Sequence, residues 1–434
     1  MDIFEIRDDA AFQTVAEKLR GPTTHPDAEE TLAGKLAAVR AVIEAVRARG
    51  DEAVAEFTQQ FDGVTLRPKE FEVPQREIDA AVDKVEPILL ATLEKARDNI
   101  EQFHSKNLRQ SWEETLDDGS MLGQRITPVE RVGVYVPGGK AYYPSSVLMN
   151  IVPAKVAGVS EIVMVSPPSF EGGIHPVVLA AAKLAGATRV FRIGGAQAVA
   201  ALAYGTKHVP GVLKITGPGN IYVTLAKRLV SSVCAIDAEA GPSEVVVIAD
   251  DAANPRYVAL ELLAQAEHEE EACAILITPS KSLAERVLEE IENEKKTLTR
   301  KEYIDAALHG QGMIIITRSL DEAAELSNLF APEHLSIQTA SPRDVLGKIT
   351  NAGAIMLGDT TPVAVGDYLA GPNHILPTAR RARFASPLTA EDFRKVTSVM
   401  SYSRERMQQD APDIQRLAEA EGLTAHARAA EIRR

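Results

Sequence analysis

Cysteine is scarce in this chain, whose 434 residues include only Cys234 and Cys273. Two thiols cannot build a scaffold of several disulfides, nor a metal site made only of thiolates. They are compatible with a reducing compartment but do not require one. A chain of this length can bury sizeable cores without cross-links. Its composition, 45% hydrophobic and 25% charged, is that of an ordinary globular protein with two or three domains.

Long apolar runs and an excess of positive charge are also missing. The most apolar stretch, residues 145–165, is interrupted by a proline and two charged side chains, so we expect no membrane span. Residues 1–13 lack the basic start and apolar core of a secretory signal, and we therefore expect a cytoplasmic protein. The net charge of −14 disfavours broad contact with a phosphate backbone, so nucleic acid is not an expected partner.

The chain up to about Arg131 is expected to be mainly helical. Residues 32–49 place apolar side chains at helical spacing. Residues 76–107 show the same pattern, and Pro87 is expected to bend that helix. Neither stretch carries a chemical motif. The single tryptophan, Trp112, follows them, and we expect it to pack in a core or an interface.

From Val132 onwards, short apolar runs alternate with helix-like stretches. Near-continuous apolar strands joined by helices predict parallel sheets covered on both faces. A first series of strands is expected at 132–136, 161–166, 189–193, 213–216 and 234–237. A second series is expected at 243–250, 273–278, 312–317, 334–339 and 352–357. The expected fold is α/β, with two doubly wound, incomplete Rossmann-like domains plus a helical N-terminal segment and a helical C-terminal tail.

These series suggest a division into four parts. The expected parts are an N-terminal helical arm at 1–26, a larger α/β domain made of 27–131 and 244–387, a second α/β domain at 132–243, and a helical tail at 388–434. The tail has little apolar surface of its own. It is therefore expected to pack on another body, either its own domains or a partner chain.

Four of the nine histidines lie near a carboxylate or carboxamide, in segments expected to be element ends or loops. The pairs are Gln265 with His268, Glu333 with His334, Asp367 with His374, and Glu421 with His426. A neighbouring carboxylate and imidazole can share proton transfer, because their pKa values can be tuned apart. Zinc takes nitrogen and oxygen ligands from separated segments. Each pair alone is also explained by a solvated surface, but together they can supply a zinc site without cysteine.

Four glycine segments are candidates for a cofactor site. They are residues 135–139, 193–198, 215–223 and 240–244. Each adjoins an expected strand, and main-chain amides at helix starts can hold phosphate. None matches the G-x-G-x-x-G fingerprint. In residues 217–222, Tyr222 stands where the third glycine would be. The segments predict a nucleotide or anion site, although tight strand-to-helix turns explain any single segment equally well.

Taken together, these segments resemble the histidinol dehydrogenase family. The resemblance runs from about residue 30 to the C-terminus. It rests on RVGVYVPGGKAYYPSSVLMN, IGGAQAVAALAYGT, TGPGN, DAEAGPSE, LLAQAEH, APEHL, GDYLAGPNHILPT and EGLTAH, in the family's order. It implies NAD-dependent oxidation of L-histidinol, through L-histidinaldehyde, to L-histidine at the end of histidine biosynthesis. No position that matches a functional residue of the family departs from its pattern.

The resemblance also implies which residues hold metal and substrate. One zinc ion per subunit would be bound by residues that also contact the substrate, namely Gln265, His268, Asp367 and His426. Further substrate contacts would come from Ser243, His334, His374 and Glu421. The family forms homodimers with exchanged elements. The tail residues Glu421 and His426 would therefore enter the site of the partner subunit.

Cofactor and proton transfer are implied in the same way. NAD would be contacted by Tyr135, Gln197 and Asn220, which lie in the glycine segments. His334 would take the alcohol proton, and Glu333 with His334 would activate water for the second oxidation. The domain at 132–243 would thus contact NAD, and the larger domain would carry the metal and the catalytic pair.

Three other functions are compatible with parts of the sequence. The first is an aldehyde dehydrogenase that uses Cys234 or Cys273 as its nucleophile, although thiols in buried strands are usually inert. The second is a zinc hydrolase, in which the same Glu–His pair activates water without NAD. The third is a binding protein that holds a ligand between two α/β domains. The crowding of ionisable residues speaks against the last.

Overall fold

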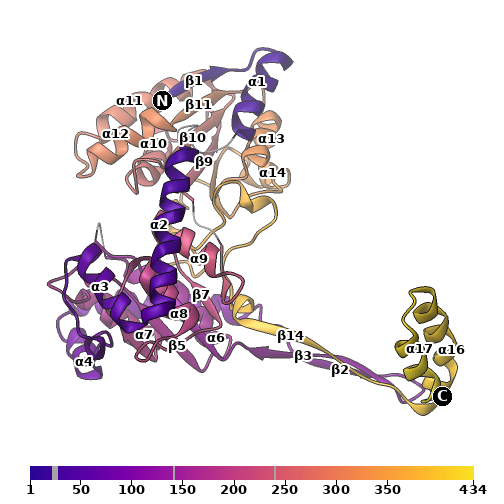
Figure 1. The fold of residues 1–434 in the computed structure, drawn as a ribbon. Coiled ribbons are helices and arrows are strands. Elements are labelled where there is room, and N and C mark those ends of the chain that lie inside the picture. Colours follow the sequence, from indigo (N-terminus) through magenta and orange to yellow (C-terminus); the bar gives the residue numbers. More distant parts are fainter. Residues whose placement is uncertain (22–27, 140–141, 239–240) are drawn as a thin grey trace.

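The structure, a computed structural model, describes residues 1–21, 28–139, 142–238 and 241–434. Figure 1 shows two α/β bodies and a long arm that leaves one of them and ends in a pair of helices. Two expectations fall partly on residues outside these ranges. They concern residues 22–26 of the N-terminal segment and Ala240 at the start of the fourth glycine segment.

The first body is built on a five-stranded parallel sheet with the order β6-β5-β4-β7-β8. Its strands are β4 (Arg131–Tyr135), β5 (Glu161–Val165), β6 (Arg189–Phe191), β7 (Lys214–Thr216) and β8 (Ala235–Ile236). The chain leaves β4 first to one side and then to the other. This reversal creates a switch point between β4 and β7, where α/β proteins bind ligands beyond the carboxyl ends of the strands.

Helices cover both faces of this sheet, because successive residues of each buried strand point to opposite sides. Val132 and Val134 pack against α4 (Gln75–Val82), α5 (Pro87–Ser105), α6 (Pro144–Val156) and α7 (Pro176–Ala185). Tyr135 and Ile215 lie on the other face, with α2 (Ala28–Arg49), α3 (Asp51–Asp62), α8 (Gly195–Tyr204) and α9 (Ile221–Val230).

This packing differs from the expected domain division. Helices α2 to α5 cover the first sheet rather than the second, so most of residues 27–131 belong with residues 132–243. Apolar spacing identifies a helix but not the sheet on which it packs. Pro87 also acts differently from the expectation, because it takes the first position of α5 instead of bending a single helix.

The second body is built on a six-stranded parallel sheet with the order β1-β11-β10-β9-β12-β13. Its strands are β1 (Asp2–Glu5), β9 (Glu244–Ala249), β10 (Cys273–Thr278), β11 (Met313–Ile316), β12 (His334–Gln338) and β13 (Ala354–Leu357). All ten strands expected after Val132 are thus confirmed. The N-terminal segment is not wholly helical, because β1 pairs with the edge strand β11, Ile3 lying beside Ile314.

Helices again cover both faces of this sheet. One face packs against α10 (Pro255–Ala266), α11 (Lys281–Glu294), α12 (Lys301–Gly310) and α15 (Val363–Tyr368). The other packs against α1 (Asp9–Arg20), α13 (Leu320–Phe330) and α14 (Pro342–Leu346). The expected cap of α10 is confirmed, since the Asn254 side chain accepts a hydrogen bond from the N–H of Arg256. The chain runs from the last turn of α10 into β10, so this turn lies at the edge of the sheet where β10 begins.

The arm is a three-stranded antiparallel sheet with the order β14-β3-β2. Its strands are β2 (Trp112–Thr115), β3 (Met121–Pro128) and β14 (Arg394–Ser401), and it ends in α16 (Arg404–Ala420) and α17 (Thr424–Glu431). The expectation of a wholly helical tail at 388–434 is therefore wrong for β14. Short 3-10 turns lie at η1 (Pro68–Glu70), η2 (Arg381–Arg383) and η3 (Ala390–Phe393). Within the described ranges, no helix is long and apolar enough to cross a membrane.

Candidate active site

A large cavity lies at the switch point of the first sheet. Its volume is about 1020 Å³, within the range of pockets that hold cofactors. Three residues of its lining are the expected cofactor contacts, Tyr135, Gln197 and Asn220. Tyr135 ends β4, Gln197 lies in the first turn of α8, and Asn220 caps α9. The structure therefore brings together three side chains that are far apart in the sequence.

The polar groups of this cavity suit an incoming ligand. The Tyr135 hydroxyl accepts a 3.1 Å hydrogen bond from the N–H of Gly195, and burial raises the pKa of Tyr135 to about 12. Gln197 is fully buried, and neither polar atom of its amide has a partner among the described residues. A buried amide without partners is costly, so a ligand that bonds it would stabilise the site. The donors and acceptors of a dinucleotide fit that requirement.

A buried ion pair fixes the turn before Asn220. The Lys227 ammonium donates a 2.9 Å hydrogen bond to the carbonyl of Gly217, and Asp237 accepts one of 2.7 Å from the N–H of the same residue. Lys227 and Asp237 also pair with each other, and both are almost fully buried. Gly217 has a φ of +108°, and an added Cβ would lie 2.1 Å from the carbonyl oxygen of Tyr135. The turn therefore requires glycine.

The expected catalytic pair lies in the second body, at the first residues of β12. Glu333 and His334 are both buried. Nδ1 of His334 lies 3.2 Å from the carbonyl oxygen of Glu244 and 3.5 Å from Oε2 of Glu333. Its Nε2 lies 3.3 Å from Oδ1 of Asp367. The imidazole is thus fixed on both sides, an arrangement suited to a general base.

Carboxylates control the charge of this imidazole. Burial alone lowers the pKa of His334, but the charges and hydrogen bonds of Glu333 and Asp367 outweigh it and raise the pKa to about 10. For Asp367 burial acts to raise the pKa, but the hydrogen bond and charge of His334 outweigh burial and leave the pKa of Asp367 below its ordinary value. For His374 burial dominates and lowers the pKa. The pKa values of the two histidines are thus shifted in opposite directions, although both contact Asp367.

The sequence did not single out Glu244, the neighbour of this pair. It begins β9, is almost fully buried, and accepts a 3.0 Å hydrogen bond from the N–H of Ala379. Burial and the nearby charge of Glu333 raise the pKa of Glu244 to about 8. The signal was available, because a glutamate at the start of an otherwise apolar strand has to be buried with a partner or a proton.

Two of the expected substrate residues, His334 and His374, meet at Asp367. Its carbonyl oxygen lies 2.9 Å from Nδ1 of His374, whose Nε2 lies 3.3 Å from Oγ of Ser146. The N–H of Ser243 donates a 3.1 Å hydrogen bond to Glu269. Ser146, on α6 of the first body, was not expected at the site. The contact shows that both bodies line it.

The expected metal ligands are brought together only in part. Gln265 is buried in the last turn of α10, and His268 follows the helix, close enough for its charge to lower the pKa of Asp367. The carboxylate, imidazole and carboxamide offer the oxygen and nitrogen donors that zinc accepts, so these residues fit the ion chemically. Among the described residues, however, no three His, Cys, Asp or Glu side chains form a group that could hold a metal ion.

The fourth expected metal ligand, His426, and the expected substrate contact Glu421 lie elsewhere. Glu421 and His426 are exposed on the helices at the end of the arm, far from β12 and α10 of the same chain (Figure 1). A hollow of about 450 Å³ lies beside His268, between α5, α6 and α15, and it includes Tyr143 and Tyr368. In a single chain the expected metal ligand His268 is thus open to solvent on this side.

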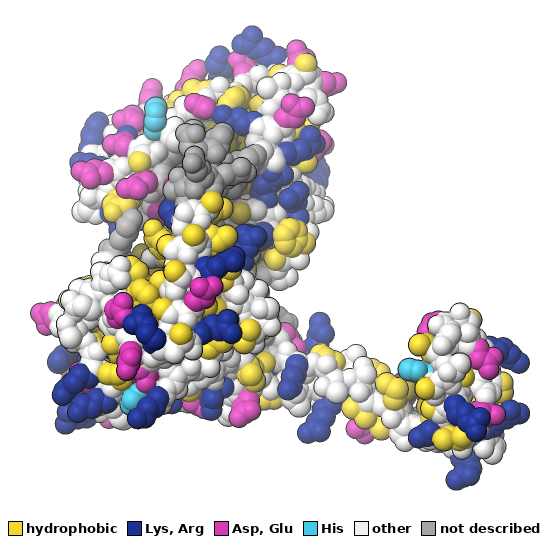
Figure 2. Space-filling model, viewed as in Figure 1, with side chains coloured by type: hydrophobic (Ala, Val, Ile, Leu, Met, Phe, Trp, Pro, Cys, Tyr) yellow, Lys and Arg dark blue, Asp and Glu magenta, His cyan; other side chains and the backbone are white. Residues whose placement is uncertain are grey.

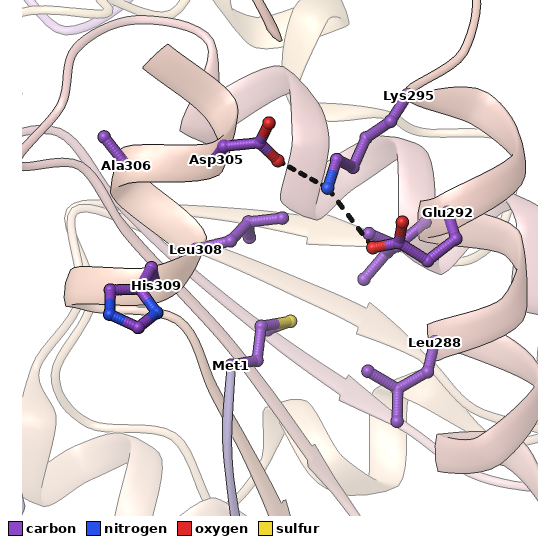
Figure 3. A pocket seen from close by; sticks show the side chains of 9 residues that line it. Met1, Leu288, Glu292, Lys295, Asp305, Ala306, Leu308 and His309 are labelled. Carbon is purple, nitrogen blue, oxygen red and sulfur yellow. Dashed lines mark hydrogen bonds and ion pairs between the residues drawn. The ribbon is translucent and has the colours of Figure 1, made fainter. Parts of the chain in front are cut away.

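Another hollow lies away from these residues, between α11 and α12, with a volume of about 580 Å³ (Figure 3). Its Lys295 points to Glu292 and Asp305 and pairs with both. Because the lysine is already neutralised, we assign this hollow no part in the chemistry.

Comparison with known proteins adds to the geometry. The sequence profile of histidinol dehydrogenase matches residues 26–434. The histidinol dehydrogenase of Heliobacterium mobile is 54% identical over 395 residues, which cover 91% of this chain and 92% of that protein. The one from Halalkalibacterium halodurans is 52% identical over 396 residues, covering 91% and 93%.

A solved structure agrees with these relatives. The crystal structure of histidinol dehydrogenase from Elizabethkingia anophelis matches with a TM-score of 0.92 at 34% identity, and the match covers 100% of this chain and 98% of that one. A cofactor-sized cavity on one sheet and a buried Glu–His pair on the next define an α/β dehydrogenase. The chain belongs to the histidinol dehydrogenase family.

Proposed function

We propose that this protein oxidises L-histidinol to L-histidine in two NAD-dependent steps, with L-histidinaldehyde held between them. The observation that carries the proposal is the buried Glu333–His334 pair, whose imidazole is fixed between the Glu244 carbonyl and Asp367. The cavity that Tyr135, Gln197 and Asn220 line supports the cofactor. The relatives named histidinol dehydrogenase support the substrate. A cytoplasmic location stays a prediction.

The residues of this chain divide the proton transfers. NAD, when bound, supplies the hydride acceptor, and zinc supplies the positive charge that orients the substrate. His334, in the neutral form of its imidazole, takes the alcohol proton in the first oxidation. In the second, Glu333 with His334 removes a proton from the water that hydrates the aldehyde. Asp367 keeps the imidazole in place, which aligns it for both steps.

Zinc would be held by Gln265, His268 and Asp367, with His426 of a second subunit. His268 is exposed in one chain, as a ligand that another subunit helps to cover would be. His374, with Ser146 of the first body behind it, would contact the substrate. Ser243 and Glu421 complete the proposed substrate contacts.

We also propose a homodimer with exchanged tails. The arm carries exposed apolar side chains, among them Trp112 at 47% exposure and Leu417 at 69%. Figure 2 shows hydrophobic side chains along the arm and at its end, away from the body of the chain. Exposed apolar surface of this kind is typical of an interface. A second copy would bury it and bring Glu421 and His426 to the open side of the metal site.

The test is turnover of L-histidinol by purified protein with excess NAD. NADH is followed by absorbance, and histidine is measured at the end. We expect two NADH for each histidine formed, loss of activity with a chelator, and recovery with zinc. One NADH with released aldehyde would contradict the role of Glu333. No NADH from folded, zinc-loaded protein would overturn the function in favour of a hydrolase.

A further inference from the structure

One short segment of the chain, residues 363–375, crosses from the second body to the first and carries two of the expected site residues. It begins in α15, where Val363 is buried in the core of the second body. It ends at Ile375, which packs against the core of the first body. Asp367 and His374 lie between these ends. The contacts that hold the segment therefore also set where these two side chains lie relative to the first body.

A proline in α6 prepares one of these contacts. In a helix, the carbonyl of each residue accepts a hydrogen bond from the N–H four residues later. Pro153 lies inside α6 and has no N–H, so it cannot bond the buried carbonyl of Met149 in this way. The side chain of Asn373 takes its place, because its Nδ2 donates a 2.6 Å hydrogen bond to the same carbonyl. The segment is thus bonded to α6 where the helix lacks a bond of its own.

The carboxamide of Asn373 is used on both sides. The side chain is buried, and its Oδ1 accepts a 2.9 Å hydrogen bond from the N–H of Ile375. The next residue, His374, approaches the same helix, with its Nε2 3.3 Å from Oγ of Ser146. Ser146 and Met149 are three residues apart on α6 and therefore lie on one side of it. Asn373 and His374 consequently contact the first body at one place.

Helix α5 supports the same segment. Nδ2 of Asn99 donates a 2.7 Å hydrogen bond to the carbonyl of Leu369. Gly371 has a φ of +102°, and a Cβ added there would lie 2.5 Å from the carbonyl oxygen of Asn99. The segment thus lies directly against the helices of the first body, and it can move away only by breaking these hydrogen bonds.

We propose that Asn373 is a positioning residue, whose bond to the Met149 carbonyl fixes His374 at the place that hydride transfer to a cofactor in the first body requires. This inference rests on the proposed function, in which His374 contacts the substrate. Reacting atoms have to come within about 3–3.5 Å of each other, so a small displacement of the segment lowers the rate. A side chain that only stabilised α6 could be replaced by a helical N–H, whereas one that positions the segment could not.

The experiment separates these two roles with three variants. Asn373→Leu removes the donor and should lower the unfolding temperature by a few degrees, because the buried Met149 carbonyl loses its partner. Pro153→Ala offers that carbonyl a helical N–H and keeps Asn373. It is the matched control and should behave like the wild type. The double variant should regain most of the lost stability, because the new N–H replaces the carboxamide.

Two further measurements show whether the position of the segment is regained as well. Hydrogen exchange followed by mass spectrometry should be faster across residues 366–375 in Asn373→Leu and in the double variant than in the wild type or Pro153→Ala. In the same two variants kcat/KM for L-histidinol should fall about tenfold or more, while the affinity for NAD, measured by calorimetry, stays near the wild-type value.

Wild-type exchange and turnover in the double variant would mean that Asn373 only completes α6, and this would overturn the inference. Absence of histidinol turnover in the wild type would contradict the proposed function instead. The exchange rates measure the effect of Asn373 on the segment in either case.

Discussion

Glu244 and Glu333 are held together by reciprocal main-chain hydrogen bonds. The N–H of Glu244 donates a 2.9 Å bond to Oε2 of Glu333, and the N–H of Glu333 donates a 3.3 Å bond to Oε2 of Glu244. Glu244 begins β9, and Glu333 directly precedes β12, the strand beside it. Two buried carboxyl groups this close carry one negative charge between them more easily than two negative charges. The pKa of Glu244 is raised, so Glu244 is the carboxyl group that holds a proton.

Glu244→Gln should change how stability depends on pH. The folded state raises the pKa of Glu244 from 4.5 to about 8, so it keeps a proton that the unfolded chain releases. As the pH rises from 4.5 to about 8, the free energy of unfolding of the wild type should therefore fall, and Glu244 should account for on the order of a few kcal/mol of this decrease. The Glu244→Gln variant should lack this part of the decrease with pH. Denaturant unfolding at a series of pH values measures it, with exposed Glu302→Gln as the control.

Glu333→Gln should slow the second oxidation more than the first. General acid–base groups contribute about 10²- to 10⁴-fold to rate, so the overall kcat should fall within that range. His334→Asn should slow both oxidations. Rapid mixing with NAD separates the steps, because Glu333→Gln should still form the first NADH. Equal loss in both steps for Glu333→Gln would contradict the proposed division of roles.

His268→Ala should release zinc. Loss of one ligand from a four-ligand site typically lowers metal affinity by orders of magnitude. The metal content of dialysed protein checks this independently of activity, with about one zinc per subunit expected in the wild type. His309→Ala, at the exposed end of α12, is the control and should keep its zinc. Full zinc content in His268→Ala would remove this histidine from the site.

Two inactive variants should restore each other. If each site takes His426 from the partner subunit, a mixed dimer of His426→Ala and Glu333→Gln contains one intact site. Random mixing of the subunits under conditions that dissociate the dimer should recover about a quarter of the wild-type activity. Mixing either variant with itself is the control. No recovery, despite mixed dimers seen by mass spectrometry, would place His426 in the site of its own chain or outside catalysis.

Neither cysteine should be needed for turnover. Cys234 and Cys273 are buried, and burial raises the pKa of the Cys234 thiol to about 12 and that of Cys273 well above its ordinary range. A thiol held in this protonated state is a poor nucleophile. Cys234→Ala and Cys273→Ala should therefore keep kcat near the wild-type value and lose some stability. A loss of kcat comparable to that of Glu333→Gln would revive the thiol mechanism.

The sequence predicted those features of the fold that depend on the local pattern of residues. The buried strands were found because β9, for instance, is apolar at every position after Glu244. The catalytic pair and the cofactor contacts came from the family resemblance and from short motifs. The structure places them at one cavity and one strand edge. Pairing between distant segments could not be predicted in this way.

The strands β1, β2, β3 and β14 were missed, and two of them share one property. β1 and β14 are paired with segments far away in the chain, β11 and β3. Their own residues are mixed and partly exposed, so period and polarity do not distinguish them from helix ends. Glu244, Lys227 and Asp237 were missed for a related reason. Their importance comes from neighbours that only the folded chain brings close.

The place of β1 in the second sheet has a consequence for folding. Residues 2–5 are synthesised before β11, their partner, which emerges only after the whole five-stranded sheet has been synthesised. At about 5–20 residues per second, β1 waits tens of seconds for its neighbour. Closing so long a loop is also slow for entropic reasons. The five-stranded sheet can therefore form during translation, although Phe393 joins its core only later, whereas the sheet next to Glu333 and His334 is completed late.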